Sequence, residues 1–100
     1  MSGAMRLPMA FTLSQNYPNP FNPTTTIEVG LPVRSDLSLK IYDVLGREVR
    51  SFEYAQVPAG LHQIVWDGKN RHGALVASGV YLYQLRAGSV VMSKRMMLVR

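Results

Sequence analysis

Hydrophobic and polar residues alternate along most of the chain with a period of two. Within residues 24–31, for example, Ile27, Val29 and Leu31 fall on one face and Glu28 on the other. Proline and glycine interrupt this alternation at intervals of roughly eight to twelve residues. No window shows a convincing helical apolar period of about 3.6 residues. The pattern therefore predicts short strands joined by turns and essentially no helix.

The strands predicted from this pattern lie near residues 11–13 and at 24–31, 37–44, 47–54, 61–67, 79–87 and 90–99. Short strands at this spacing predict an all-β fold, an immunoglobulin-like β-sandwich of about seven antiparallel strands. Gly46 is expected to adopt a positive φ in a tight hairpin turn. The expected core residues are Ile27, Val29, Leu39, Ile41, Trp66, Tyr81 and Leu85.

A proline-rich segment precedes the second strand. Residues 14–24 contain three prolines, which fix φ and cannot donate to a sheet ladder, so this segment is expected to be an irregular or polyproline-like arm. Tyr17 and Phe21 are spaced to pin the arm onto a hydrophobic surface. We expect residues 1–12 to be a lead-in, partly linker or cloning scar, and residues 13–100 to form one domain.

The amino-acid composition excludes several classes of site and function for this chain. One hundred residues suit a single core, and 47% hydrophobic residues suffice to build it. The net charge of +5 comes from scattered cations, which favours a solvated basic surface over a dedicated anion-binding one. The absence of cysteine excludes disulfides, thiolate metal sites and cysteine nucleophiles. No apolar run is long enough for a membrane-spanning helix or a signal peptide.

Catalytic and metal-binding arrangements are hard to find. His62 falls in a predicted strand and His72 in a loop, without a nucleophile motif beside either, and the six acids offer no facing pair. The loop from Asp67 to Gly73 has calcium-loop residue types, but its intervening cations repel calcium, which favours a turn capped by Asp67. We predict no enzyme activity, no metal and no cofactor.

Two ligand classes depend on exposed aromatic residues. Nucleic-acid binding would need cations beside Tyr42, Tyr81 and Tyr83, and no cationic cluster flanks them, so we predict no nucleic-acid partner. Trp66 could form a carbohydrate-stacking platform, but a tryptophan at the end of a strand is more often a buried core residue. A carbohydrate-binding module therefore remains an alternative.

Four motifs, in order, resemble a known family. They are Asn16-Tyr-Pro-Asn-Pro-Phe-Asn-Pro-Thr-Thr-Thr-Ile27, Ile41-Tyr-Asp-Val-Leu-Gly-Arg-Glu-Val49, Pro58-Ala-Gly-Leu-His-Gln-Ile-Val-Trp-Asp-Gly68 and Ala77-Ser-Gly-Val-Tyr-Leu-Tyr-Gln-Leu-Arg-Ala-Gly88. Together with the basic-then-apolar close, Lys94-Arg-Met-Met-Leu-Val-Arg100, they resemble the type A C-terminal sorting domain of the type IX (Por) secretion system. The same strand motifs resemble the immunoglobulin-like domain of flagellar hook-capping proteins.

The resemblance implies a non-catalytic sorting signal at the end of a larger exported cargo protein of Bacteroidota-type bacteria. Its implied partners are the outer-membrane translocon and a sortase-like peptidase, which would cleave near residues 5–13. Many such cargoes become attached to anionic lipopolysaccharide at the cell surface, after transit through the periplasm. The implied recognition residues are Gly79, Val80, Tyr81, Lys94, Arg95, Met96, Met97, Leu98 and Val99.

The last predicted strand could also lie at a sheet edge. An edge strand can accept another chain as an added strand, so the translocon could read residues 96–99 in this way. The same edge could support a homodimer. Two other functions stay open: a carbohydrate-binding or structural accessory module of an exported hydrolase, and a scaffold domain of the hook-capping type.

Overall fold

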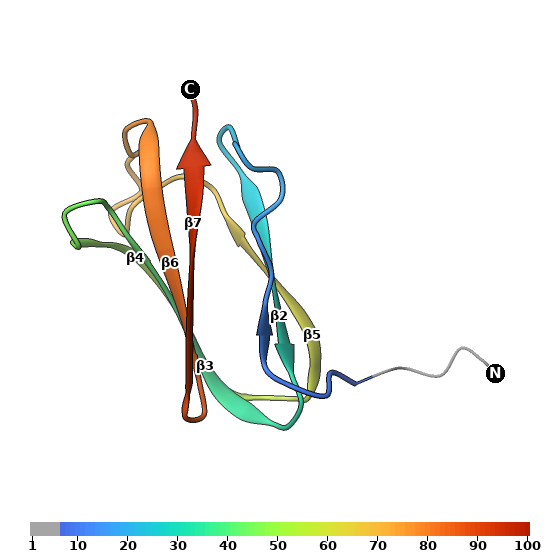
Figure 1. Ribbon diagram of the computed structural model, residues 1–100. Coiled ribbons are helices and arrows are strands. Elements are labelled where there is room, and N and C mark those ends of the chain that lie inside the picture. The colour runs from blue at the N-terminus through green and yellow to red at the C-terminus, as the bar shows by residue number, and fades with distance from the viewer. Residues whose placement is uncertain (1–6) are drawn as a thin grey trace.

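The computed structural model describes residues 7–100, which form seven strands and no helix. The strands are β1 (Thr12–Leu13), β2 (Thr25–Leu31), β3 (Ser35–Tyr42), β4 (Glu48–Val57), β5 (Gly60–Trp66), β6 (Gly79–Ala87) and β7 (Val90–Leu98). They make two facing sheets (Figure 1). The predicted all-β, immunoglobulin-like sandwich is thereby confirmed.

The two sheets are antiparallel and unequal in size. One contains three strands in the order β1-β2-β5, and the other contains four in the order β4-β3-β6-β7. The chain crosses between sheets after β2, after β4 and after β5, so β2 pairs with β5 and β3 pairs with β6, although neither pair is consecutive in the sequence. This topology places β7 at the edge of the larger sheet, with β6 as its strand partner.

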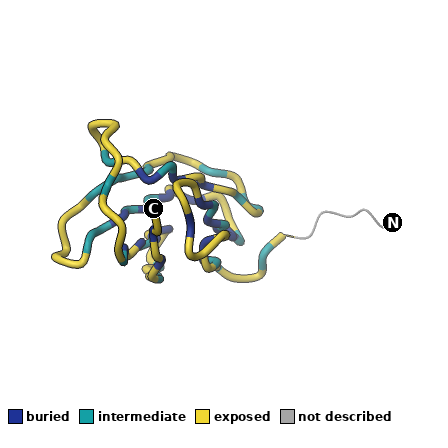
Figure 2. Tube along the Cα trace, turned by 90° about the horizontal axis from the view of Figure 1, so that it is seen from above, coloured by how far each residue is buried: buried dark blue, intermediate teal, exposed yellow. Residues whose placement is uncertain are grey.

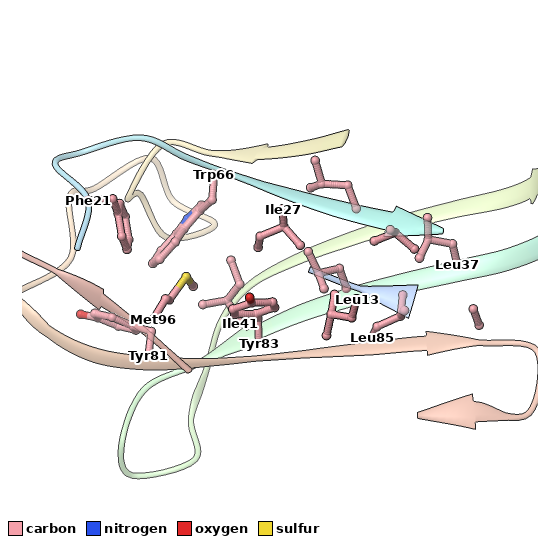
Figure 3. Close-up of a cluster of buried hydrophobic side chains, with 14 of the residues drawn as sticks. Leu13, Phe21, Ile27, Leu37, Ile41, Trp66, Tyr81, Tyr83, Leu85 and Met96 are labelled. Atoms are coloured by element: carbon pink, nitrogen blue, oxygen red, sulfur yellow. The ribbon is translucent and has the colours of Figure 1, made fainter. Parts of the chain in front are cut away.

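The core lies between the sheets, where the apolar faces of the strands meet. Buried positions alternate with exposed ones along the strands and gather between the two layers (Figure 2). All seven residues predicted for the core are buried. At one end of this core, Trp66 packs between Phe21 and Tyr81, with ring centroids 5.6 and 5.5 Å away (Figure 3). Such tilted aromatic contacts add to the stabilisation from buried area.

Strand β4 differs most from its predicted range, because it runs three residues beyond 47–54. It is the other edge strand of the larger sheet, and its residues are half-buried or exposed, so alternation does not mark its end. The end is set by pairing instead, since Ser35 of β3 faces Val57 across a register shift. The strand predicted over 79–87 is confirmed, and the other predicted ends differ from the observed ones by at most two residues.

The turn from β3 to β4 has a local cause. The carboxylate of Asp43 accepts hydrogen bonds from the amides of Leu45 and Arg47, at 2.9 and 3.0 Å. This capping ends β3 at Tyr42, two residues before the predicted end. Gly46 has a φ of 80°, as predicted, which a residue with a Cβ adopts at a cost.

The proline-rich arm is irregular and lies against the sandwich. Phe21 is 1% exposed, so its predicted anchoring role is confirmed. The same prediction for Tyr17 is wrong, because that side chain is 81% exposed. Tyr17 instead forms an isolated bridge with Thr26 through its main chain, which turns its side chain outward. Residues 1–6 of the predicted lead-in lie outside the described residues.

Candidate functional site

The two groups of recognition residues inferred from sequence become neighbours in the sheet. Strand β6 pairs with β7 so that Gly79 faces Leu98, Val80 faces Met97, and Tyr81 faces Met96. The intervening turn reverses the chain at Gly88, whose φ is 58°. Segments about fifteen residues apart in the sequence therefore form one two-stranded surface.

Alternation along the two strands divides these residues between the core and the outside. Tyr81, Met96 and Leu98 are buried between the sheets, so no partner can contact their side chains in the folded domain (Figure 3). Arg95, Met97, Val99 and Gly79 are exposed, and Lys94 and Val80 are half-buried. Among the exposed residues, Arg95, Met97 and Val99 form one outward row along the end of β7 and the residue after it. We call it the outer row of β7.

The arm covers the C-terminal half of the β7 edge. The amide of Phe21 donates to the carbonyl oxygen of Met97, and the amide of Val99 donates to the carbonyl oxygen of Phe21, both at 3.0 Å. The amide of Met97 donates to Asn19 Oδ1 at 3.0 Å, and Gln15 Nε2 donates to the carbonyl oxygen of Arg95 at 2.6 Å. Adding a strand alongside residues 96–99 would therefore require displacing the arm.

Sequence reasoning missed this role of the arm. It identified Phe21 as an anchor but gave no function to Gln15 or Asn19, which bond to residues about eighty positions away. The available signal was the two asparagines beside prolines, Asn19 and Asn22, because asparagine side chains commonly bond to main-chain groups. That signal identifies a hydrogen-bonding residue but not its distant partner.

The chain's charge is strongly asymmetric. Asp67 is its last acidic residue, so residues 68–100 carry +6 and residues 1–67 carry −1. The six cations after Asp67 are Lys69, Arg71, Arg86, Lys94, Arg95 and Arg100. The ion pairs found among residues 7–100 involve Lys40, Arg47 and Arg50, none of which belongs to β6 or β7. The β6–β7 ribbon is therefore a cationic surface free of acids.

Two tyrosines of β6 are structural. Tyr83 donates its hydroxyl hydrogen to the carbonyl oxygen of Ser14 at 2.7 Å and accepts from the amide of Asn16 at 2.9 Å. Burial raises the pKa of Tyr83 to about 12, and burial likewise raises the pKa of Tyr81. Both phenols stay neutral near pH 7. The hydroxyl of Tyr83 joins β6 to the arm, and the hydroxyl of Tyr81 donates to the carbonyl oxygen of Ala77 at 2.6 Å.

The loop from Asp67 to Gly73 has the predicted turn structure. Asp67 Oδ1 accepts the amide of Lys69 at 3.1 Å and the guanidinium of Arg50 at 3.3 Å. Asn70 Oδ1 accepts the amides of His72 and Ala74. These oxygens are thus already bonded within the protein. In the described part of the chain, no group of three or more His, Cys, Asp or Glu residues is placed to hold a metal ion.

Trp66 is not a stacking platform. It is fully buried, and its indole N–H donates to the carbonyl oxygen of Lys69 at 2.9 Å. The expectation that it belongs to the core is confirmed, and a carbohydrate site built on it is incompatible with this fold.

Within residues 7–100, no helix is long and apolar enough to cross a membrane.

Comparison with known proteins identifies the family. The model of the FlgD Ig-like domain matches residues 15–90, from the arm to the first residue of β7. The chain belongs to the FlgD Ig-like domain family. Basal-body rod modification protein FlgD from Salmonella typhimurium and that from Salmonella typhi are each 36% identical over 67 residues, which cover 66% of this chain. The chain matches only 29% of the length of those FlgD proteins.

Solved structures share the fold of this FlgD Ig-like domain. Dimeric latent PorU from Porphyromonas gingivalis matches 90% of this chain and 9% of its own, with a TM-score of 0.72 and 24% identity. PorZ is a surface component of the type IX secretion system of the same organism. It matches 90% of this chain and 11% of its own, with a TM-score of 0.62 and 25% identity. FlgD from P. aeruginosa matches 79% of this chain and 68% of its own, with a TM-score of 0.60 and 21% identity.

Proposed function

We propose that this FlgD Ig-like domain is a non-catalytic sorting domain that directs a larger exported protein through the type IX outer-membrane translocon to the cell surface. The outer row of β7 carries the proposal. Arg95, Met97 and Val99 are exposed side by side on a strand that is held firmly at a sheet edge. This arrangement offers a rigid cationic and apolar pattern, which a recognition signal needs.

Two further observations support the sorting role. The domain shares its fold over 90% of its length with PorU and with PorZ, a protein described as part of the type IX system. The match to the family model ends at Val90, so nearly all of β7 lies beyond the matched segment. In our proposal, the basic-then-apolar strand is the part that would serve the sorting role.

A translocon could contact either the main chain or the side chains of β7, and we expect side-chain contact. Because the arm bonds to the main chain of Met97 and Val99, the translocon would contact the outer row through side chains. A sortase-like peptidase would act before the arm, where Met9 is 99% exposed and lies outside both sheets. The cationic β6–β7 ribbon would favour the anionic lipopolysaccharide to which such cargoes become attached.

A scaffold role is the second candidate, and the family match favours it. FlgD of Salmonella typhimurium is a basal-body rod modification protein, and 66% of this chain aligns with it at 36% identity. In that role the sandwich would pack against other copies or subunits of an exported assembly. It would then have no effect on the export of an unrelated protein.

A fusion experiment tests the sorting role. Residues 7–100 would be attached to the C-terminus of a periplasmic reporter in a host with a working type IX system, and in the same host lacking the translocon. We expect the reporter at the surface of the first host and in the periplasm of the second. A reporter that stays in the periplasm of both, although the domain is folded, would overturn the sorting role and favour the scaffold.

A further inference from the structure

The edge of β7 is covered over only half of its length. The arm bonds to the outward main-chain groups from the carbonyl of Arg95 to the amide of Val99. These groups belong to odd-numbered residues, and the pairing with β6 continues without a shift from Val90 to Leu98. Since main-chain groups alternate sides along a strand, the amides and carbonyls of Val91 and Ser93 also point away from β6.

The uncovered half has unpaired hydrogen-bonding groups. Among residues 7–100, no backbone or side-chain hydrogen bond reaches the outward groups of Val91 and Ser93 or the amide of Arg95. Val91 is 49% exposed and Ser93 is exposed. In Figure 1, β6 borders β7 along the sheet, whereas the arm lies near the C-terminal end of β7. Such an uncovered edge is a template for another strand.

The charge around this edge selects the partner. Arg95 lies on the outer face of β7, and Arg86 of β6 lies beside Val91 on the same face. No acidic residue follows Asp67, so nothing on β6 or β7 neutralises these cations. On the opposite face, Met92 is half-buried and packs against the core, and the half-buried Lys94 follows it. An added strand therefore meets arginines on one face and an apolar residue beside a lysine on the other.

We propose that the edge from Val91 to Arg95 binds an extended acidic segment of another protein as a fifth strand of the larger sheet. Main-chain hydrogen bonds would supply affinity, acidic residues would match Arg86 and Arg95 on one face, and apolar residues alternating with them would contact Met92 on the other. A second copy of this chain fits less well, because its β7 would bring Lys94 and Arg95 against their own counterparts. Like charges on paired strands are destabilising.

This inference goes beyond the sorting role, which needs only the outer row of side chains. The probe is a short synthetic peptide in which glutamate and valine alternate. We expect it to bind the domain and to shift the amide resonances of Val91–Arg95 more than those of Met97 and Val99. Added salt should weaken binding, because exposed charges are screened. A peptide with lysine in place of glutamate is the charge control.

Two changes separate strand addition from simple charge attraction. The peptide with alternate backbone nitrogens methylated keeps its charge but cannot donate along one edge, and it should bind at least about tenfold more weakly. Ser93→Pro removes an outward amide that β6 does not use, and it should weaken binding similarly, whereas Ser93→Thr should not. The methylated peptide leaves the protein unaltered, so it distinguishes strand addition from charge attraction even if the Ser93→Pro variant misfolds.

Three results would overturn the proposal: equal binding of the lysine peptide, equal binding of the methylated peptide, or resonance shifts confined to other strands. Self-association of the free domain through β7, detected by sedimentation, would instead identify a second copy as the occupant and also overturn it. The reporter fusion distinguishes this failure from that of the sorting role. An exported domain without peptide binding refutes only the edge, and a peptide-binding domain that is not exported refutes only the sorting role.

Discussion

The main-chain amide of Phe21 donates a hydrogen bond to the carbonyl oxygen of Met97 at 3.0 Å, which joins the proline-rich arm to the last strand. The ring of Phe21 is buried against Trp66 at the same place. Phe21 thus makes two of the four hydrogen bonds by which the arm covers this half of the β7 edge, and its ring closes one end of the core. The arm is consequently part of the domain, and its removal should affect β7 directly.

The charge at the start of the outer row is expected to be needed for export. The double variant Lys94→Glu, Arg95→Glu reverses it and leaves the apolar positions of β7 in place. We expect the reporter fusion to accumulate in the periplasm, while the change at the exposed Arg95 alters the free energy of unfolding by about 0.5 kcal/mol or less. The matched control, Lys94→Arg with Arg95→Lys, should be exported normally. Full export of a folded reversed variant would show that this charge is not recognised.

The arm should contribute strongly to stability through one side chain only. Phe21→Ala removes a ring that is 1% exposed and should lower the free energy of unfolding by about 3–5 kcal/mol. Tyr17→Ala, in the same arm, removes a ring that is 81% exposed and should change it by about 0.5 kcal/mol or less. Denaturant titration measures both. Similar effects for the two variants would contradict the placement of the arm.

Trp66 is expected to be a core residue without a ligand role. Trp66→Ala should lower the free energy of unfolding by about 3–5 kcal/mol, because the buried indole leaves a cavity and Lys69 loses its hydrogen-bond donor. Chemical denaturation followed by circular dichroism measures the loss. A loss below about 1 kcal/mol, accompanied by lost polysaccharide binding, would contradict the buried position.

Tyr83 should make the domain sensitive to alkali. Burial raises its pKa in the folded state to about 12, from the 10.0 of an unperturbed tyrosine. Because the folded-state value is the higher one, the stabilisation is fully present below pH 10 and is lost as the pH rises towards 12. Thermal melts across this range should show the decline, and Tyr83→Phe should lack that part of it. A parallel decline in both proteins would refute the assignment.

The sequence by itself determined the fold class, the strand count and part of the core. Alternation of residues such as Ile27 and Val29 defines an apolar face locally, and glycines such as Gly46 mark turns through backbone conformation. It also singled out Phe21 as an anchor and Trp66 as a core residue. Each of these features depends on residues close together in the chain.

Only the tertiary structure decided which residues of the candidate site are accessible. Alternation indicates two faces for β7, but pairing with β6 and contact with the other sheet bury Met96 and Leu98 and expose Met97. The arm reaches the same strand from about eighty residues away, and no local pattern specifies that contact. Long-range hydrogen bonds form where the packed sheets place their groups, so the division of β7 into a covered half and an open half appears only in the folded domain.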